Sequence, residues 1–499
     1  MKLKVNIIGS GVGGSGVGAL LQHSGFDVTL FEKNSLIGGR LSTFEREGFK
    51  LDVGCHLIAN SDKGRLGKIA QIIEKPNSIK WNYCRPLPKF HFNGQIIKFP
   101  RDVGKLNFSS KDLGNFIKLY SDVLKFSDKE IEKLMYVPID EFVGRYTDDP
   151  KAQALISYFC GLYFVTQQAT STGEFIICQK EMMQNRSSGY PTGGCIAIPS
   201  AYCDAIIQDK GKVKTEIKVK KIIVESNKAT GVELEDGKFI ESDIVISNAG
   251  IKATTLNLVG EKYFSKEFVQ KVKDYTFSAA TLMVKVALDE KISEENMFMY
   301  VNFDDLPRAV EQFGKEFGID QELVSKIISG EISTNEVMSK ISLGEILKSE
   351  AFKNYIPEKH YMIMVPVVSN LDPTSAPEGK QLIFGGSGVP ANPSEGNCDY
   401  DKWADSIYNG LLDIFPNMEE HVMWKEITTP AEIEKFAGQG GNVIGIGQTV
   451  DQVGKFRPPM ELPIENLYVV GADTGMHGIG AELAADSALL LYEKLMKKL

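Results

Sequence analysis

The beginning of the chain alternates between short apolar runs and turns of small residues. Residues 5–8 are apolar except for Asn6 and predict a buried strand, and Asp27–Phe31 predicts a second strand. Between them, the glycines, alanine and leucines that end with Leu21 predict a helix. A strand, a helix and a strand in this order form the repeating unit of a parallel sheet, so the pattern predicts an α/β fold.

Later stretches of the chain also have strand-like patterns. Residues 215–223 and 243–249 are rich in isoleucine and valine, and residues 381–384 form a short apolar run after a turn. An Asn93-Gly94 pair between two apolar runs predicts a hairpin. By contrast, residues 304–350 are charged, with apolar residues at helical spacing, and fit a lid, an oligomer contact or a surface helical pair equally well.

The longest apolar stretch, residues 154–165, is too short to cross a bilayer, which requires about 20 apolar residues. It fits a buried helix of a substrate domain, or an apolar entrance at a membrane surface that would make this a peripheral membrane protein. Its aromatic residues fit the wall of an apolar tunnel and ordinary core packing equally well; they are Tyr158, Phe159, Tyr163 and Phe164.

A glycine-rich loop joins the first strand to the first helix. Gly9, Gly11 and Gly14 have the G-x-G-x-x-G spacing: the first permits a tight turn, the second lets the backbone approach a pyrophosphate, and the third lets helix and strand pack closely. The helix N-terminus offers free N–H groups and the positive end of its dipole to phosphates. A glycine-rich turn between two core elements is the alternative interpretation.

An acidic residue ends the second strand. Glu32 lies 18 residues after Gly14, where its carboxylate can accept hydrogen bonds from both hydroxyls of a ribose. An acid at this position disfavours a 2′-phosphate, so the pocket suits FAD or NAD and not NADP. Because strand, loop, helix and acid occur together, a dinucleotide site is a far stronger interpretation than the glycines alone would support.

Four further motifs follow in order. They are Gly38-Gly39-Arg40, Asp52-Val53-Gly54-Cys55-His56, Pro191-Thr192-Gly193-Gly194, and Gly471-Ala472-Asp473 with Gly478-Ile479-Gly480. In these motifs the chain resembles the FAD-dependent amine oxidase and phytoene desaturase superfamily. It is most similar to the branch that holds bacterial phytoene desaturases, carotenoid isomerases and retinol saturases. The resemblance runs along the whole chain and is sparse between residues 270 and 430.

The resemblance implies an α/β fold in which a Rossmann-like FAD-binding domain of the glutathione-reductase type is built from discontinuous segments and carries an α+β substrate domain. We expect the FAD-binding domain to comprise residues 1–75, 192–255 and 440–499, and the substrate domain residues 76–191 and 256–439. Because there is one complete dinucleotide loop, electrons would pass to or from a quinone, dioxygen, a redox carrier or transiently bound NAD(P)H.

The resemblance also implies which residues contact FAD. Arg40 would bind the pyrophosphate or the ring edge, with a solvated surface arginine as the alternative, and Asp473 would bind the ribityl or phosphate region unless it is a helix N-cap. A helix beginning near Gly478 would direct its positive end at the pyrimidine edge of the flavin. The expected cofactor-binding residues are Gly9, Gly11, Val12, Gly13, Gly14, Glu32, Lys33, Gly38, Gly39, Arg40, Leu41, Gly54, Cys55, His56, Val219, Asn248, Ala249, Gly471, Asp473, Gly478, Ile479 and Gly480.

Three residues are candidates for catalysis beside the flavin: Cys55, His56 and His477. His56 can donate a hydrogen bond or a proton near neutral pH, and a satisfied structural histidine is the alternative. Cys55 fits a covalent or charge-transfer contact with the flavin, although a small buried thiol is the favoured alternative. His477 stands where much of this branch has proline, and it introduces a titratable group close to the flavin.

Two other functions are compatible with the superfamily. Its amine oxidases commonly flank the substrate with two aromatic residues, and one of these positions is Ala481 here. Escort proteins of the same superfold bind lipidated partners without flavin, but their phosphate motifs tend to decay, whereas this chain keeps Gly9, Gly11 and Glu32. We therefore expect an FAD-dependent oxidoreductase that acts by hydride transfer on a hydrophobic, unsaturated, isoprenoid- or carotenoid-like substrate, by desaturation, saturation or isomerisation.

Composition narrows the partners and the compartment. With 499 residues, 43% of them hydrophobic and 24% charged, the chain has the size and character of a globular protein of two or three domains. A net charge of −9 without a basic run argues against a nucleic-acid partner. Seven cysteines without a C-x-x-C pair fit a reducing compartment and predict no metal site. The first strand begins too early for a signal peptide, so we expect a cytoplasmic protein, either free or peripheral to the inner face of the membrane.

Overall fold

Five parallel strands from three distant stretches of the chain form one sheet. They are, in spatial order, β19 (Leu467–Val469), β13 (Ile244–Ser247), β1 (Lys4–Ile8), β2 (Asp27–Phe31) and β9 (Lys212–Lys214). β1 lies in the centre, with Ile7 paired to Leu30 on one side and to Ile246 on the other. The strands predicted at residues 5–8, at Asp27–Phe31 and within residues 243–249 are confirmed, and the fold class is α/β.

The computed structural model describes residues 2–54, 57–92, 94–98, 101–102, 105, 110–147, 162–166, 168–302, 322, 325–326 and 354–498. Several predictions made from the sequence therefore fall on residues outside this set. They concern Cys55, His56, Asn93, Tyr158, Phe159 and nearly all of residues 304–350.

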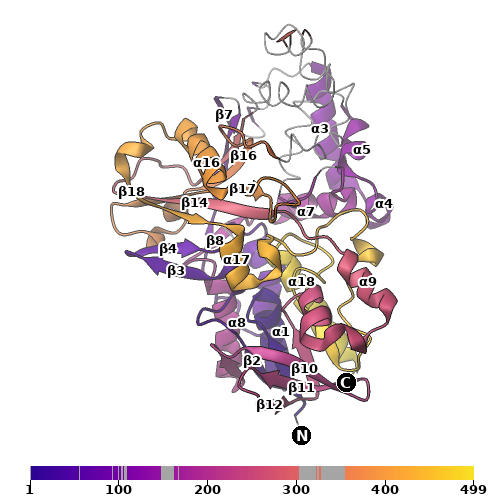
Figure 1. The fold of residues 1–499 in the computed structure, drawn as a ribbon. Coiled ribbons are helices and arrows are strands. Elements are labelled where there is room, and N and C mark those ends of the chain that lie inside the picture. Colours follow the sequence, from indigo (N-terminus) through magenta and orange to yellow (C-terminus); the bar gives the residue numbers. More distant parts are fainter. Residues whose placement is uncertain are drawn as a thin grey trace.

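Helix α1 (Val12–His23) begins directly after the glycine loop and packs against α8 (Ala197–Gln208) and α18 (Ala481–Lys498). The glycines of α1 allow a close approach. A Cβ atom on Gly18 would lie 2.8 Å from Ile206 Cδ1 of α8, and one on Gly16 would lie 3.0 Å from Ile69 Cδ1 of α2 (Arg65–Ile72). Figure 1 shows α1, α8 and α18 grouped in the same half of the molecule as β2.

A mixed seven-stranded sheet forms the other half of the molecule (Figure 1). Its strands are, in order, β18 (Val422–Thr428), β14 (Ala280–Leu288), β17 (Gln381–Val389), β16 (Met362–Pro366), β15 (Met297–Val301), β6 (Lys89–Phe92) and β7 (Gln95–Lys98). β6 and β7 form the predicted hairpin, with Phe92 opposite Gln95, and the strand predicted at residues 381–384 is the beginning of β17. Helix α16 (Tyr400–Ile414) contacts β14, β16 and β17 and buries its apolar face on them.

Among the described residues, three smaller sheets accompany the two large ones. β10 (Val219–Glu225), β11 (Lys228–Leu234) and β12 (Phe239–Glu241) form an antiparallel sheet, while β3 (Thr43–Arg46) pairs with β4 (Phe49–Asp52), and β5 (Trp81–Tyr83) pairs with β8 (Gly189–Pro191). The strand predicted from residue 215 therefore begins later, at Val219. The reason is local: Glu216 has a φ of 58°, so extended backbone cannot pass through it.

The remaining helices lie outside the two large sheets. They are α3 (Ser110–Lys125), α4 (Asp128–Leu134), α5 (Ile139–Gly144), α7 (Thr172–Asn185), α9 (Lys266–Asp274), α15 (Val368–Leu371), α17 (Pro430–Ala437) and a π-helical segment (Ala253–Gly260). α7 contacts α3, α4 and α5 and brings this helical group against the core. In the part of the chain that the structure describes, no helix combines the length and apolarity needed to span a bilayer.

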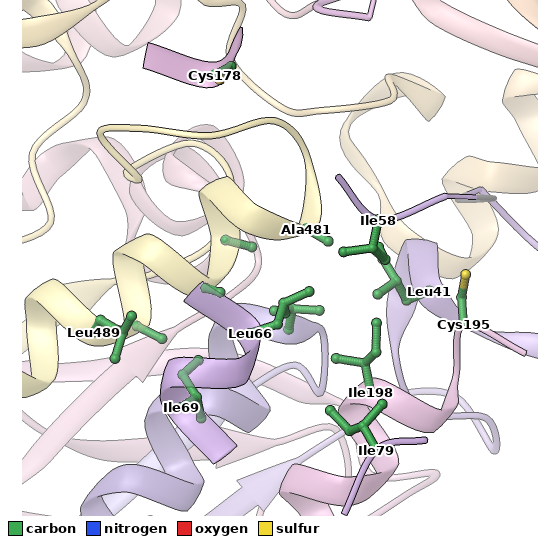
Figure 2. Packing of buried hydrophobic residues seen from close by; sticks show 14 of the residues in the cluster. Leu41, Ile58, Leu66, Ile69, Ile79, Cys178, Cys195, Ile198, Ala481 and Leu489 are labelled. Carbon is green, nitrogen blue, oxygen red and sulfur yellow. The ribbon is translucent and has the colours of Figure 1, made fainter. Parts of the chain in front are cut away.

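The largest hydrophobic cluster joins segments that are far apart in the sequence. Figure 2 shows Leu41, Ile58 and Ala481, from three different stretches of the chain, together with Leu66 of α2 and Leu489 of α18. All five side chains are buried within one cluster. Because their burial depends on the early and late segments being together, the hydrophobic effect itself holds the discontinuous segments in place.

Candidate functional site

A cavity of about 1550 Å³ has walls from both large sheets. Ile8 and Phe31 of the parallel sheet line one end, and Met299 and Met364 of the mixed sheet line the other. Its volume exceeds the roughly 300–1,000 Å³ of a pocket for one ligand. The cavity therefore has room for a dinucleotide and for a second molecule beside it.

Most residues predicted to bind the cofactor line this one cavity. They come from the glycine loop, the end of β2, the segment before β3, the turn after β13 and the segment before α18. These lining residues are Gly9, Gly11, Val12, Gly13, Glu32, Lys33, Gly38, Gly39, Arg40, Leu41, Gly54, Val219, Asn248, Ala249, Gly471, Asp473, Ile479 and Gly480.

The other predicted residues are placed differently. Gly14 lies behind the loop, where a Cβ atom would be 2.1 Å from the Gly9 carbonyl oxygen, so it serves the close packing of helix and strand. Gly478 has a φ of 112° and lies against the backbone of Glu482. Cys55 and His56 lie outside the described residues, and their proposed roles beside the flavin stay predictions.

The N-terminus of α1 is open to an anion. Among the described residues, no side chain caps its first turn, and its N-cap is Gly11. A Cβ atom on Gly11 would lie 2.7 Å from Asn248 Nδ2, so only glycine leaves the backbone accessible there. The unpaired N–H groups and the helix dipole make this end a site for a phosphate group.

Glu32 holds the glycine loop in place through hydrogen bonds to its backbone and to one of its side chains. Its Oε2 accepts hydrogen bonds from the Ser10 N–H at 3.0 Å and the Ser10 hydroxyl at 2.7 Å, and its Oε1 accepts one from the Asn34 N–H at 2.9 Å. The side chain is buried, and it lines the cavity beside Val219. A carboxylate has about four acceptor positions, so Glu32 keeps capacity for a ribose hydroxyl.

Arg40 is not a solvated surface residue. Its Nε donates to the Asn442 carbonyl at 2.8 Å, and its terminal nitrogen donates to Gln439 Oε1 at 3.1 Å and to Asn442 Oδ1 at 2.9 Å. Burial lowers the pKa of the Arg40 guanidinium, and the charge of Asp473 opposes that effect. Arg40 therefore places a positive charge in the cavity wall while it holds the 439–442 turn.

Asp473 ties three segments together and is not the N-cap of α18, which begins at Ala481. Its Oδ1 accepts from the Ile446 N–H at 3.0 Å, and its Oδ2 accepts from the Ile251 N–H at 2.9 Å and from Gln439 Nε2 at 3.0 Å. Gln439 thus links Arg40 to Asp473. Asp473 therefore does not cap the helix of its own segment, and its contact with the ribityl or phosphate region stays a prediction.

Arg457 is a further buried cation beside this junction. Its guanidinium donates to the carbonyls of Gly475 at 3.0 Å, Ile446 at 2.9 Å and Ala472 at 2.6 Å. Burial lowers the pKa of Arg457 to about 10. Arg457 fixes the backbone on both sides of Asp473, a role that no motif in the sequence indicates.

The first turn of α18 carries a buried acid. Glu482 lines the cavity region next to Gly480, and its Oε2 accepts a hydrogen bond from the Arg65 N–H at 3.1 Å, at the beginning of α2. Burial raises the pKa of Glu482 to about 7, and the charge of Arg65 opposes the rise. No motif in the sequence indicates this residue; its only sequence signal is an acid in the first turn of a helix.

Asp52 fixes the D-x-G-x-H segment. Its carboxylate accepts hydrogen bonds from Thr43 Oγ1 at 2.6 Å, the Tyr190 hydroxyl at 2.5 Å and the Cys195 N–H at 2.9 Å. Burial raises the pKa of Asp52, and the bonds from Thr43 and Tyr190 oppose that rise. The network ties β4 to β8 and holds the backbone that continues to Gly54 in the cavity wall.

Within the described residues, His477 does not line the cavity. Its ring Nδ1 lies 2.9 Å from Oε1 of Glu174 on α7, and its backbone N–H donates to Asp486 Oδ2 at 3.3 Å. The hydrogen bond to Glu174 raises the pKa of His477, and burial opposes that effect. The observed contacts link α7 to the loop before α18, so a role of His477 beside the flavin stays a prediction.

The second end of the cavity is apolar. Its lining includes Phe90, Phe116, Phe164, Met297 and Met299. Of the described residues at this end, none is aspartate, glutamate, histidine or lysine, and the ionised side chains are Arg85 and Arg186. Of the aromatic residues considered for a tunnel, Phe164 lines the cavity, whereas Tyr163 is buried in the core and donates to the Glu174 carbonyl at 3.1 Å.

Many residues of this apolar end carry no sequence motif. They come from the segment after β5, from α3 and from α7; examples are Pro86, Leu87, Ile117, Tyr120, Gln179, Met182 and Met183. The one periodic signal is on α7, where Gln179, Met182 and Met183 recur at helical spacing.

Comparison with known proteins identifies a family, several distant relatives and solved structures of the same fold. The family described as flavin containing amine oxidoreductase matches residues 18–281. The chain is 22% identical to a 4,4'-diaponeurosporene oxygenase of Staphylococcus haemolyticus over 95% of this chain and 93% of that one, and 23% identical to a chloroplastic prolycopene isomerase of Daucus carota over 98% and 79%. An oxidoreductase structure from Methanosarcina mazei has the same fold, with a TM-score of 0.72, 22% identity, and coverage of 98% of this chain and 100% of that one.

Proposed function

The chain belongs to the flavin containing amine oxidoreductase family, and from this premise we propose that it is an FAD-dependent oxidoreductase acting on a hydrophobic, unsaturated, isoprenoid-like substrate. The reaction is desaturation, saturation or isomerisation of carbon–carbon bonds. One observation carries the proposal: the glycine loop and Glu32 line the same cavity as the apolar wall formed by Phe90, Phe164 and Met299.

The residues that line the cavity at the parallel sheet fit FAD. The open N-terminus of α1 suits a pyrophosphate, Glu32 suits the adenosine ribose, and Arg40 adds a positive charge. The absence of room for a Cβ atom at Gly11 and Gly13 supports close contact between backbone and cofactor. We assign the predicted lining residues to FAD on this basis, and we propose that Cys55 and His56 lie at the flavin ring.

When bound, the flavin would supply a two-electron acceptor or donor of hydride. The protein itself would orient the substrate and exclude water from the site. The methionine and phenylalanine side chains that line the cavity would surround the reacting carbons, exclude water and hold an extended apolar chain by burial of its surface. Because no described acid or base lines the apolar end, we infer that the substrate needs no charged partner at its reacting carbons.

This composition also weighs against an amine substrate. A protonated amine in an apolar cavity requires a carboxylate or an aromatic cage, and burying a charge without a partner is costly. Ala481 lines the cavity where amine oxidases of the superfamily commonly have an aromatic residue, and the described apolar end has no carboxylate. The relatives named for diaponeurosporene and prolycopene support a polyene substrate instead.

The proposal assigns one role to each of the two predicted domains. Residues 1–75, 192–255 and 440–499 would bind FAD, and residues 76–191 and 256–439 would cover the substrate. Electrons would pass to or from a quinone, dioxygen, a redox carrier or transiently bound NAD(P)H. Peripheral association with the inner face of a membrane would give an apolar substrate direct access to the cavity.

The test is anaerobic reduction and reoxidation of the bound flavin with a panel of compounds. The panel contains carotenoids, retinoids, enoyl compounds, quinones, NAD(P)H and amines, and flavin absorbance reports electron transfer. We expect a long unsaturated hydrocarbon or its derivative to change the redox state of the flavin, and amines to leave it unchanged. Reduction by amines alone would contradict the proposal.

A further inference from the structure

One face of α7 forms a wall of the apolar end of the cavity, and its side chains become more exposed toward the C-terminus of the helix. Gln179, Met182 and Met183 line the cavity at spacings of three and four residues, which place them on one side of the helix, and Arg186, the left-handed residue that ends α7, also lines the cavity. Gln179 is 5% exposed, the two methionines are half-buried, and Arg186 is exposed. The helix therefore runs from the interior of the cavity outward, over about 10 Å at 1.5 Å per residue.

A second arginine lies at the outer end of this wall. Arg85, in the segment after β5, lines the cavity and is exposed, and its terminal nitrogen donates to the Arg186 carbonyl at 3.3 Å. The side chain of Leu87 beside it is 65% exposed although it also lines the cavity. Residues that line a cavity and are open to solvent mark its mouth, so Arg85 and Arg186 lie where the apolar space meets water.

The two guanidinium groups have donors to spare. Arg186 uses its Nε on the Met183 carbonyl at 3.4 Å, and Arg85 stacks 5.6 Å from the centre of the Tyr83 ring. In the described part of the chain, the hydrogen bonds of both arginines go to carbonyl groups, and neither arginine forms an ion pair with an acidic side chain. In a chain of net charge −9, two arginines without a carboxylate partner at an apolar mouth form a local positive site.

We propose that Arg85 and Arg186 bind the anionic head group, a carboxylate or a phosphate, of an amphiphilic substrate whose apolar chain enters the cavity along α7. This inference rests on the proposed function, because it needs an apolar ligand in the cavity, and it adds the chemistry of the ligand's other end. Arginine presents several N–H donors in a planar fork that matches carboxylate and phosphate oxygens. Gln179, at the buried end of the same helix face, contributes an amide that can bind a polar group further along the chain.

The arrangement also sets the position of the substrate. A head group held at Arg186 and an apolar chain following Met183 and Met182 fix how far the chain reaches into the cavity. The carbon presented to the reacting centre is then determined by its distance from the head group. A fixed distance from the head group would select one bond of a long chain in which the successive carbons are chemically alike.

The experiment compares two single-chain probes that differ only at the head: oleate and oleyl alcohol, titrated into the FAD-loaded protein by calorimetry at about pH 8, where the carboxylate is ionised. We expect the native protein to bind oleate at least about tenfold more tightly than oleyl alcohol, and to lose this preference as salt rises from about 50 to about 500 mM. The R85Q/R186Q variant should bind both probes equally, with unchanged affinity for the alcohol. The R85K/R186K variant should keep part of the preference, and Arg145→Gln, an exposed arginine paired with Glu141, should keep all of it.

Four outcomes would overturn the inference or its basis. Equal affinity of the native protein for both probes, or a preference that survives in R85Q/R186Q, contradicts the head-group site and leaves the proposed function standing. If neither probe binds the native protein, the apolar cavity is not a ligand site, and the proposed function fails with it. A membrane source of the anion is tested with vesicles: if the arginine pair is required only for sedimentation with anionic phospholipid vesicles, and not for the preference for oleate, the pair binds a lipid surface and the proposal is wrong.

Discussion

Gly13 and Gly471 bring the beginning and the end of the chain into backbone contact. A Cβ atom on Gly13 would lie 2.7 Å from the Gly471 amide nitrogen and 2.9 Å from its Cα. The same atom would lie 2.7 Å from Oδ1 of Asn248, which follows the middle strand β13. Three distant segments thus meet at the position where the first helix begins, and the cavity wall is continuous across them.

Replacing Gly13 by alanine is expected to weaken flavin binding. The added methyl group has no room, and forcing it in costs about 1–3 kcal/mol, or about 5- to 150-fold if the strain falls on the bound state. The matched control is Gly114→Ala in α3, where a Cβ atom would meet nothing within 4 Å. Flavin fluorescence on titration measures both variants; equal affinity of Gly13→Ala and native protein would show that the contact does not shape the site.

Replacing Glu32 by alanine is also expected to lower the affinity for FAD. The substitution leaves the Ser10 and Asn34 N–H groups without their carboxylate and removes the acceptor for ribose. Hydrogen bonds to a charged group contribute roughly 1.5–3 kcal/mol each, so we expect a loss of about 10- to 100-fold. Glu45→Ala, at an exposed acid of β3, is the control. Retention of full affinity by Glu32→Ala in an equilibrium titration would remove Glu32 from the cofactor site.

The strand–loop–helix–strand beginning was predictable from the sequence because its signals are local. Asp27–Phe31 is a strand with the predicted bounds, since apolar alternation and the following acid lie within a few residues of each other. The hairpin around Gly94 was predictable for the same reason. The glycine spacing likewise reflects a local requirement, namely the lack of space for a Cβ atom at Gly11 and Gly14.

The apolar end of the cavity was not predictable, because its residues are brought together only by the tertiary fold. Leu87, Ile117 and Met364 belong to a loop, a helix and a strand, and each is an ordinary apolar residue in its own segment. Arg457 was missed because a single arginine gives no sign that it will be buried among carbonyl groups. The contact of His477 with Glu174 was not predictable either, because the two residues lie 303 positions apart in the sequence.

The stability of the protein is expected to depend on the ionisation of Glu482. Its pKa is raised to about 7 in the folded protein, above its ordinary value of 4.5, so the folded state binds more protons than the unfolded state between these values. The contribution of this group to the free energy of unfolding therefore falls as pH rises from 4.5 to 7. Glu482→Gln should remove that fall and be more stable than the native protein near pH 8 by about 1–3 kcal/mol.

Denaturant unfolding at several pH values measures this effect. The difference between Glu482→Gln and native protein should be small near pH 4 and grow as pH increases. A difference that does not change with pH would mean that Glu482 titrates normally, and that its burial has no electrostatic cost.

The pair of His477 and Glu174 is expected to stabilise the protein at low pH. The pKa of His477 is raised in the folded state, so its stabilisation is complete below the unfolded value of about 6.5 and is lost as pH rises through the folded value. Glu174→Gln removes the charge partner and should flatten this dependence. Thermal midpoints across pH 5–9 compare the two proteins, and a parallel pH dependence in both would rule out the coupling.

Filling the apolar end is expected to block substrate and spare the flavin. Met364→Trp places a larger side chain at a residue that lines the cavity, whereas Met364→Ala enlarges the space. We expect the tryptophan variant to lose binding of long-chain ligands by at least about tenfold while its flavin content and absorbance remain native. The alanine variant should still bind the same ligands. Loss of flavin in both variants, or normal ligand binding in the tryptophan variant, would separate this end of the cavity from the substrate.

The account depends most directly on the union of three chain segments into one FAD site. Titration of the flavin-free protein with FAD, followed by quenching of flavin fluorescence, tests it. We expect saturation at one FAD per chain, with binding that is weakened by Gly13→Ala, by Glu32→Ala and by substitution of Asp473 in the late segment. A protein that does not bind FAD, or that binds it unchanged after all three substitutions, would contradict the account.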